Sequence, residues 1–510
     1  MFKYEKFNAS SIVTAPAVER VVEFSPSGLD AGDVARVLSL AVDGKVISSE
    51  ANDGFADITG RVNFRLVYQT REGGVRGVDY NADFNLKVEG NFTGDDSVSA
   101  EVAVVEADVT TGDSVVLSAV VSVRASAVQR TEEECLVDAE QCYKTVDTVR
   151  LPSLVAAKTV SVSVSEEAEA GDVDSVLLAD AQAVIVSAVA GDGKITVEGK
   201  VRAAVTYTED EEIRIREMVV PFTEEILADG VEEGDKVCAS AAVRTSKIVL
   251  AGVPGANIIR FDADIAVRVS VVRCRETDVI ADMFMLTNEV ELGRENRKFT
   301  FFGGLKYVSE SISGTASLED RPPAESVIAV PYARCFAAKA EVTDTGALVE
   351  GVLTADVIYR DENGLNSVRA EVPYSVEIDG TFGAEVRAVC FVEEIKAKAR
   401  RGELDIEAEV GILLTHYEVG EAEYISSVTV GEEKERLRAL PLHRVRRRRD
   451  VGCVQGAHRN TRGHSRTKSD SVRSPRGRRQ GGVFQNTGVN ALPAQRGKRR
   501  RGLCPLRLCI

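Results

Sequence analysis

The chain has 510 residues, of which 44% are hydrophobic and only 5% aromatic, with no Trp. At about 100–200 residues per domain, this length predicts three or four domains. No apolar run reaches the ~18 residues that a membrane-spanning helix needs, and the opening segment MFKYEKFNASS lacks the apolar core of a secretory signal. We therefore expect a cytoplasmic protein with no membrane span.

The charge differs sharply between the two ends of the chain. Residues 436–510 carry 21 Lys and Arg against 2 Asp and Glu, whereas residues 1–435 carry 42 against 78. Taken alone, a basic end of this kind is typical of a tail that binds nucleic acid, because its cations contact phosphates.

One strand pattern occurs three times in the chain. A glycine is followed eight residues later by a tyrosine, with apolar residues alternating between them, in GRVNFRLVY, GKVRAAVTY and GVLTADVIY. The intervals are 139 and 152 residues, whereas solenoids repeat every ~20–50 residues. The pattern therefore predicts three copies of a whole domain. We call the end residues of the pattern the markers: Gly60, Tyr68, Gly199, Tyr207, Gly351 and Tyr359.

The three copies extend over about residues 28–130, 167–276 and 320–420. Turn residues rich in Gly, Asn and Asp lie before and after each marker strand and are typical of hairpins. About five antiparallel strands per copy predict an all-β protein of three repeated sandwich or open-barrel domains. We expect the marker glycines at a bulge or strand start and the marker tyrosines in the core. In copy one, Arg61, Asn63 and Arg65 then lie on the opposite, polar face of the strand.

Two segments between the copies, 131–166 and 277–319, differ in texture from the repeats. Each has an acidic or mixed stretch followed by an extended run. For each we predict a short helix and a strand that crosses to the next domain. The predicted boundaries are residues 1–130 for domain one, 131–286 for a linker with domain two, 287–435 for a linker with domain three, and 436–510 for a disordered basic tail.

Candidate chemical groups are few and isolated. His416, the one histidine before the tail, lies in the alternating segment GILLTHYEV, which favours a packed or edge histidine. Gly191-Asp192-Gly193-Lys194 lacks the first glycine and the final Ser or Thr of a phosphate-binding loop and predicts a hairpin tip. Asp172 and Asp174 are interpreted as a solvated turn, and Cys135 and Cys142 as free thiols. We expect no catalytic, cofactor-binding or metal-binding residues, and therefore no enzyme.

Residues 1–435 resemble the SPOCS-domain family of Firmicute proteins linked to spore-envelope assembly. The resemblance rests on the opening FKYEKFNASS, the GDVxxVL box at 32–38 with a variant at 171–177, the marker strand, and the segment CLVDAEQCYKTVDTVRLPSL. Copy three departs from the box and reads AESVIAV at 324–330. The resemblance implies a C-terminal LysM module that binds glycan or protein. It also implies, for some members, an adaptor role that recruits a coat-scaffold ATPase to the forespore surface.

The tail does not resemble a LysM module as it stands. A one-base shift of the reading frame, with permitted codons, converts residues from Leu437 onward into a LysM-like string that ends at a permitted stop near Val489. We therefore hypothesise a frameshift near Glu435–Arg436, so that the tail is an out-of-frame remnant with no nucleic-acid partner. Binding of peptidoglycan would then require the intact module.

These observations favour a non-enzymatic scaffold or adaptor in spore envelope or coat assembly, which docks protein partners on the mother-cell side of the developing spore. The alternative is a cell-envelope protein that recognises glycan.

Sequencing the gene across codons 430–440 tests the frameshift. We expect a single-base insertion or deletion relative to relatives whose frame continues into a LysM module. An intact frame, together with relatives that share the Arg-rich tail, would contradict the hypothesis.

Overall fold

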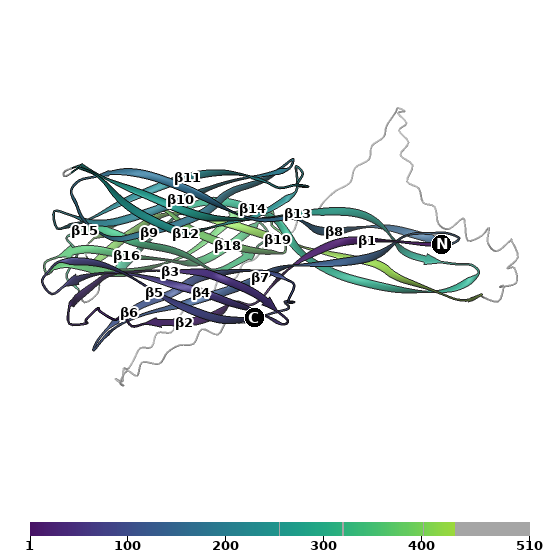
Figure 1. Cartoon of the computed structure of the whole chain (residues 1–510), viewed down its shortest axis with the longest axis horizontal. Helices are drawn as coiled ribbons and strands as arrows, with labels where there is room; N and C mark the ends of the chain where they lie inside the picture. Colours follow the sequence, from purple (N-terminus) through teal and green to yellow (C-terminus); the bar gives the residue numbers. More distant parts are fainter. Residues whose placement is uncertain (254–255, 319–320, 401, 434–510) are drawn as a thin grey trace, which may run out of the picture. The chain divides into compact units, whose positions relative to one another are not determined.

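Every regular element that the computed structural model describes is a β-strand (Figure 1). The described residues are 1–253, 256–318, 321–400 and 402–433. Neighbouring strands in all six sheets run antiparallel, which confirms the predicted all-β class. None of these residues forms a helix long and apolar enough to cross a membrane. The basic tail predicted at 436–510 lies outside the described residues.

Copy one consists of two sheets whose central strands are β4 and β7. The first sheet has the order β3-β4-β5, and in the second β7 pairs with β6, β1 and β2. β1 and β2 lie along successive stretches of β7, so that together they occupy one strand position. The strands are β1 (Phe2–Thr14), β2 (Val18–Phe24), β3 (Val34–Asn52), β4 (Phe55–Thr70), β5 (Val75–Glu89), β6 (Ser97–Thr111) and β7 (Val115–Ala139).

Copies two and three repeat this order, with one edge strand in place of β1 and β2. Copy two has sheets β9-β10-β11 and β12-β13-β8, and copy three has β15-β16-β17 and β18-β19-β14. The strands of copy two are β8 (Tyr143–Ala170), β9 (Val173–Gly191), β10 (Lys194–Glu209), β11 (Glu212–Leu227), β12 (Lys236–Val253) and β13 (Ala256–Phe284). Those of copy three are β14 (Asn288–Ser317), β15 (Ser326–Val342), β16 (Gly346–Asp361), β17 (Gly364–Asp379), β18 (Glu385–Arg400) and β19 (Glu403–Glu433).

Each copy therefore has six strand positions, whereas the turn signals predict about five. The sixth is supplied by β8 and β14, which come from the segments interpreted as linkers. The two sheets of each copy close over an apolar core of its own. Along one side, β3 lies beside β6, β9 beside β12, and β15 beside β18, without a shared ladder. We call this line of contact the seam of the copy.

Where the structure describes the segments between copies, they contain no helix, so the predicted short helices are wrong. Instead β7 continues to Ala139 and β8 begins at Tyr143, and β13 and β14 meet in the same way at Phe284 and Asn288. Val and Thr recur through these stretches, as in YKTVDTV, which favours extended backbone. The predicted crossing strands are present as β8 and β14. The domain boundaries stay a prediction, because the described residues all fall within one compact unit, Met1–Leu437.

Three two-stranded ribbons, which we call the arms, extend the second sheets (Figure 1). They join 2–11 to 129–139, 143–156 to 271–284, and 288–304 to 416–433. The arms share an apolar core. It includes Cys135 of the first arm, Leu151 of the second and Phe302 of the third. Inside it the Tyr424 hydroxyl donates a buried hydrogen bond to Glu133. A second small core, which includes Leu136 and Ile425, also joins the arms.

Candidate functional site

The marker glycines lie inside the central strand of the first sheet of each copy. Each is directly opposite an aromatic residue of the next strand, in the pairs Gly60–Phe84, Gly199–Phe222 and Gly351–Tyr374. The ring lies over the glycine, and a Cβ placed on Gly60 would be 2.3 Å from Phe84 Cζ. A glycine in a strand often marks such a close approach, and the aromatic ring restores the contact area that glycine lacks.

A β-bulge lies beside each marker glycine, in the preceding strand and not at the glycine itself. The strand ladders skip one residue there, namely Ile47 in β3, Val186 in β9 and Ala338 in β15. No marker glycine begins a strand. A bulge bends the strand that carries it and increases its twist, which brings the edge of the first sheet towards the second sheet.

The marker tyrosines are buried in the cores of their own copies. Tyr68, Tyr207 and Tyr359 each lie in the core cluster between the two sheets. They are at most 4% exposed, in agreement with the expectation of a core role. The markers therefore identify the central strand of each domain and the core that it covers.

The three copies contact one another in a closed cycle. β4 and β5 of copy one contact β9 of copy two, β10 and β11 contact β15 of copy three, and β16 and β17 contact β3 of copy one. The approach is very close at Gly77, where a Cβ would lie 1.8 Å from the carbonyl oxygen of Leu177. On the closing side, Ser367 Oγ donates to the Val37 carbonyl over 2.9 Å. We call this region the junction.

The apolar part of the junction comes from equivalent positions of the three copies. Leu38, Leu177 and Ala329 lie 22 residues before their marker glycines and belong to one buried cluster. Val67 and Ile358, one residue before their marker tyrosines, belong to the same cluster. One small core is thus shared by the three repeats.

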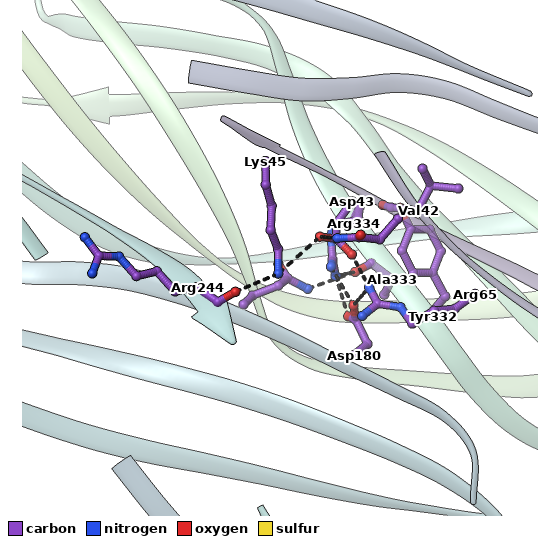
Figure 2. Close-up of polar contacts among 11 residues, drawn as sticks. Val42, Asp43, Lys45, Arg65, Asp180, Arg244, Tyr332, Ala333 and Arg334 are labelled. Carbon is purple, nitrogen blue, oxygen red and sulfur yellow. Dashed lines mark hydrogen bonds and ion pairs between the residues drawn. The ribbon is translucent and has the colours of Figure 1, made fainter. Parts of the chain in front are cut away.

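A buried carboxylate, Asp180, joins the three copies electrostatically (Figure 2). Asp180 belongs to copy two and is 2% exposed. Both terminal nitrogens of Arg334, from copy three, donate to it over 2.5 and 2.6 Å, and Arg65 of copy one donates over 3.2 Å. Arg65 also pairs with Asp43 over 2.5 Å. Because Asp180 accepts from two arginines in a dry site, each of these charges has a partner.

Burial raises the pKa of Asp180, but the charge and hydrogen bonds of Arg334, with the charges of Arg65 and Arg202, outweigh burial. The net result is a pKa lowered to about 2. The carboxylate therefore stays ionised over the whole physiological range.

Copies one and three are joined by a second buried group around Tyr332. The Tyr332 hydroxyl donates to the Val42 carbonyl over 3.0 Å, and its ring faces the guanidinium groups of Arg334 and Arg369. Arg369 pairs with Asp356 of its own copy over 2.7 Å and donates to the Leu40 carbonyl of copy one over 2.6 Å. Burial raises the pKa of the Tyr332 hydroxyl to about 12, so it remains a hydrogen-bond donor.

The junction has no local signal in the sequence. Alternation places Arg65 on the polar face of the marker strand, and the structure agrees, but that face is covered by the next copy and the side chain is only 15% exposed. Alignment of the copies carries a usable signal. Five residues after the marker glycine stand Arg65, Ala204 and Asp356, so that one position changes its charge between repeats.

The other candidate groups lie apart from the junction. His416 lies in β19 against the Phe382 ring, and burial lowers its pKa. Gly193, with φ +70°, forms the hairpin tip between β9 and β10. Cys135 and Cys142 are free thiols. Among the described residues no three His, Cys, Asp or Glu side chains are placed to hold a metal ion.

The marker glycine can be tested in copy one. We expect Gly60→Ala to destabilise the protein by about 1–3 kcal/mol in urea unfolding, because the new methyl group collides with the Phe84 ring. Phe84→Leu should relieve this collision, so the double variant should lose less stability than the sum of the single variants. The control is Gly94→Ala, where the nearest atom is 3.8 Å away. Strict additivity would contradict the proposed contact.

The buried carboxylate can be tested with Asp180→Asn. Removing one partner of a buried ion pair costs about 3–5 kcal/mol at pH 7. The folded-state pKa of Asp180, about 2, lies below the ~3.9 of a free Asp. The difference in unfolding free energy between wild type and variant should therefore be full above about pH 4 and shrink as the pH falls towards 2.

The control for this series is Asp83→Asn, which removes an exposed pair with Arg61. It should leave the unfolding free energy nearly unchanged. If the difference in unfolding free energy between wild type and Asp180→Asn does not vary between pH 5 and pH 2, the electrostatic role of Asp180 is contradicted.

Copies two and three each match a known protein family. Residues 172–250 and 327–400 match the family model described as SipL, SPOCS domain. The first match begins just before β9 and ends within β12, and the second begins one residue inside β15 and ends with β18. Each therefore covers the first sheet and the strand across the seam. No curated protein and no solved structure matches the chain. The predicted resemblance to the SPOCS-domain family is confirmed for these parts of copies two and three.

Proposed function

We propose that this protein is a non-enzymatic scaffold or adaptor in the assembly of the spore envelope or coat. The family match points to a role connected with sporulation. The finer proposal, that the repeated β-domains dock partner proteins, is supported by the way in which the copies are joined. We further propose that the protein acts in the cytoplasm on the mother-cell side of the developing spore, as the family resemblance implies.

The observation that carries the proposal is the closed cycle of three similar domains. Asp180, Arg334 and Arg65 bind the three copies to one another inside a buried site. Three related domains held in a fixed arrangement offer related surfaces at fixed spacing. A partner with several binding segments then gains affinity, because its second contact is effectively intramolecular.

The proposal counts copy one as a third domain of the same kind. The family model matches copies two and three only. Copy one shares their strand order, the aromatic residue opposite its marker glycine, and the bulge beside it. We keep the boundaries proposed from the sequence, 1–130, 131–286 and 287–435, although β7 of domain one runs on to Ala139.

The second arm offers an edge that suits a protein partner. β8 is an edge strand, and its first six residues, Tyr143–Thr148, are all exposed. Tyr143 stacks on Phe284 with ring centroids 5.0 Å apart, and Val146 is 55% exposed. Unpaired backbone groups at such an edge accept an extended segment of another protein as a further strand. We assign an extended segment of the protein partner to this edge.

The test is binding of the full chain to the purified coat-scaffold ATPase that the family resemblance implies. We expect saturable binding, and at least a several-fold loss of affinity for Val146→Lys, because a charge at the edge opposes strand addition. The matched control is Val219→Lys on β11, a valine of similar exposure, which should bind as the wild type does.

A parallel arm measures retention of the chain on purified peptidoglycan. Strong retention, with no binding of the ATPase, would overturn the scaffold proposal and favour recognition of glycan. If Val146→Lys and the wild type bind the ATPase with equal affinity, the scaffold proposal stands, but the assignment of the partner segment to the β8 edge is wrong.

A further inference from the structure

The seam of each copy brings two residues face to face. Both seam strands carry a bulge, for example at Ile47 in β3 and Val105 in β6. Three residues before these bulges stand Gly44 and Val102. They are so close that a Cβ on Gly44 would lie 2.5 Å from Val102 Cγ1. The bulges of copy two are at Val186 and Arg244, and the residues three positions earlier are Ala183 and Ala241. Those of copy three are at Ala338 and Glu393, and the residues three positions earlier are Cys335 and Cys390.

Copy three has polar groups at three positions that are apolar in the other copies. Cys335 in β15 and Cys390 in β18 face each other across the seam, and the Tyr374 hydroxyl lies 3.1 Å from Cys390 Sγ and 3.1 Å from the Phe336 carbonyl oxygen. Tyr374 stands opposite its marker glycine, where copies one and two have Phe84 and Phe222. Two facing thiols and a hydroxyl that contacts one of them therefore occur together in one copy.

We propose that Cys335 and Cys390 form an oxidisable dithiol that closes the seam of copy three with a disulfide. A hydroperoxide is the oxidant. The Cys390 thiolate attacks its O–O bond and becomes a sulfenic acid, and the leaving oxygen departs as water or an alcohol after taking a proton. The Cys335 sulfur then attacks the sulfenic sulfur, and the S–S bond forms as the thiol proton and the hydroxyl leave as water.

The surroundings of the two thiols distinguish their roles. The contact with Cys335 lowers the pKa of Cys390, and the hydrogen bond with Tyr374 acts in the same direction against burial. The contact with Cys390 and burial raise the pKa of Cys335. We therefore assign the first reaction to Cys390, which lies beside the Tyr374 hydroxyl, and the resolving role to Cys335.

The cross-link would act next to a contact between copies. Glu393, the bulge residue of β18, follows Cys390 by three residues. Its carboxylate binds Lys200 of copy two over 2.9 Å and Ser309 over 2.8 Å. A disulfide between β15 and β18 would hold this part of β18 in place, so oxidation should strengthen the hold of copy three on copy two.

The experiment treats the reduced full chain with hydrogen peroxide, blocks the remaining thiols with N-ethylmaleimide and maps the peptides by mass spectrometry. We expect a Cys335–Cys390 cross-linked peptide, lighter by two hydrogen atoms than its reduced parts. The thermal unfolding midpoint should rise on oxidation and return on reduction.

Cys335→Ala should abolish both the cross-link and the rise of the midpoint, and it should fold because copy two has alanine at this position. The matched control, Cys274→Ala, removes an exposed free thiol on β13 and should leave both unchanged. Tyr374→Phe, which copies the residue of the other repeats, should form the same cross-link several-fold more slowly.

Three outcomes would overturn the proposal. These are full alkylation of Cys335 and Cys390 after peroxide, oxidation of Cys390 to a sulfinic acid without a cross-link, and cross-linking that joins other cysteines while these two stay reduced.

Discussion

The structure depends on one buried carboxylate that is shared by three repeats. Asp180 lies where the copies meet, and the guanidinium groups of Arg65 and Arg334 reach it from the two other copies. Buried ion pairs add little net stability compared with apolar contacts, but an unpaired buried charge is costly. An arrangement that separates copy two from copy three leaves Asp180 without its two hydrogen bonds from Arg334. We infer that the junction specifies how the copies assemble, while the three apolar cores supply most of the stability.

The repeats are alike where each domain folds and differ where the domains meet. Every copy has the glycine opposite an aromatic residue, the bulge beside it and the buried tyrosine. At the junction, equivalent positions carry different groups, as with Arg65 and Asp356, or Asp43 and Arg334. If all three copies had the same residue at each of these positions, like charges would meet at the junction and repel one another. This set of charge pairs could then not form. Divergence at these positions therefore suits a single chain that closes on itself.

Sequence alone predicts the repeat and the class because both depend on local pattern. Alternation and turn residues specify strands, and the marker tyrosines are apolar-face residues that enter the core as expected. The segments around Tyr143 and Asn288 were misinterpreted, because an edge strand pairs with a partner more than a hundred residues away and shows no local turn signal. The alternation places Arg65 correctly on the polar face of its strand, but it does not predict its burial, since that burial depends on another copy. Such contacts appear in a sequence only when the repeats are compared position by position.

If the junction joins the three copies firmly, they unfold together as one body. Scanning calorimetry of the full chain at neutral pH measures this. We expect one unfolding transition for the body, with a calorimetric enthalpy equal to the van't Hoff enthalpy. Three separate transitions, or a calorimetric enthalpy about three times the van't Hoff value, would mean that the copies unfold independently and that the junction does not unite them.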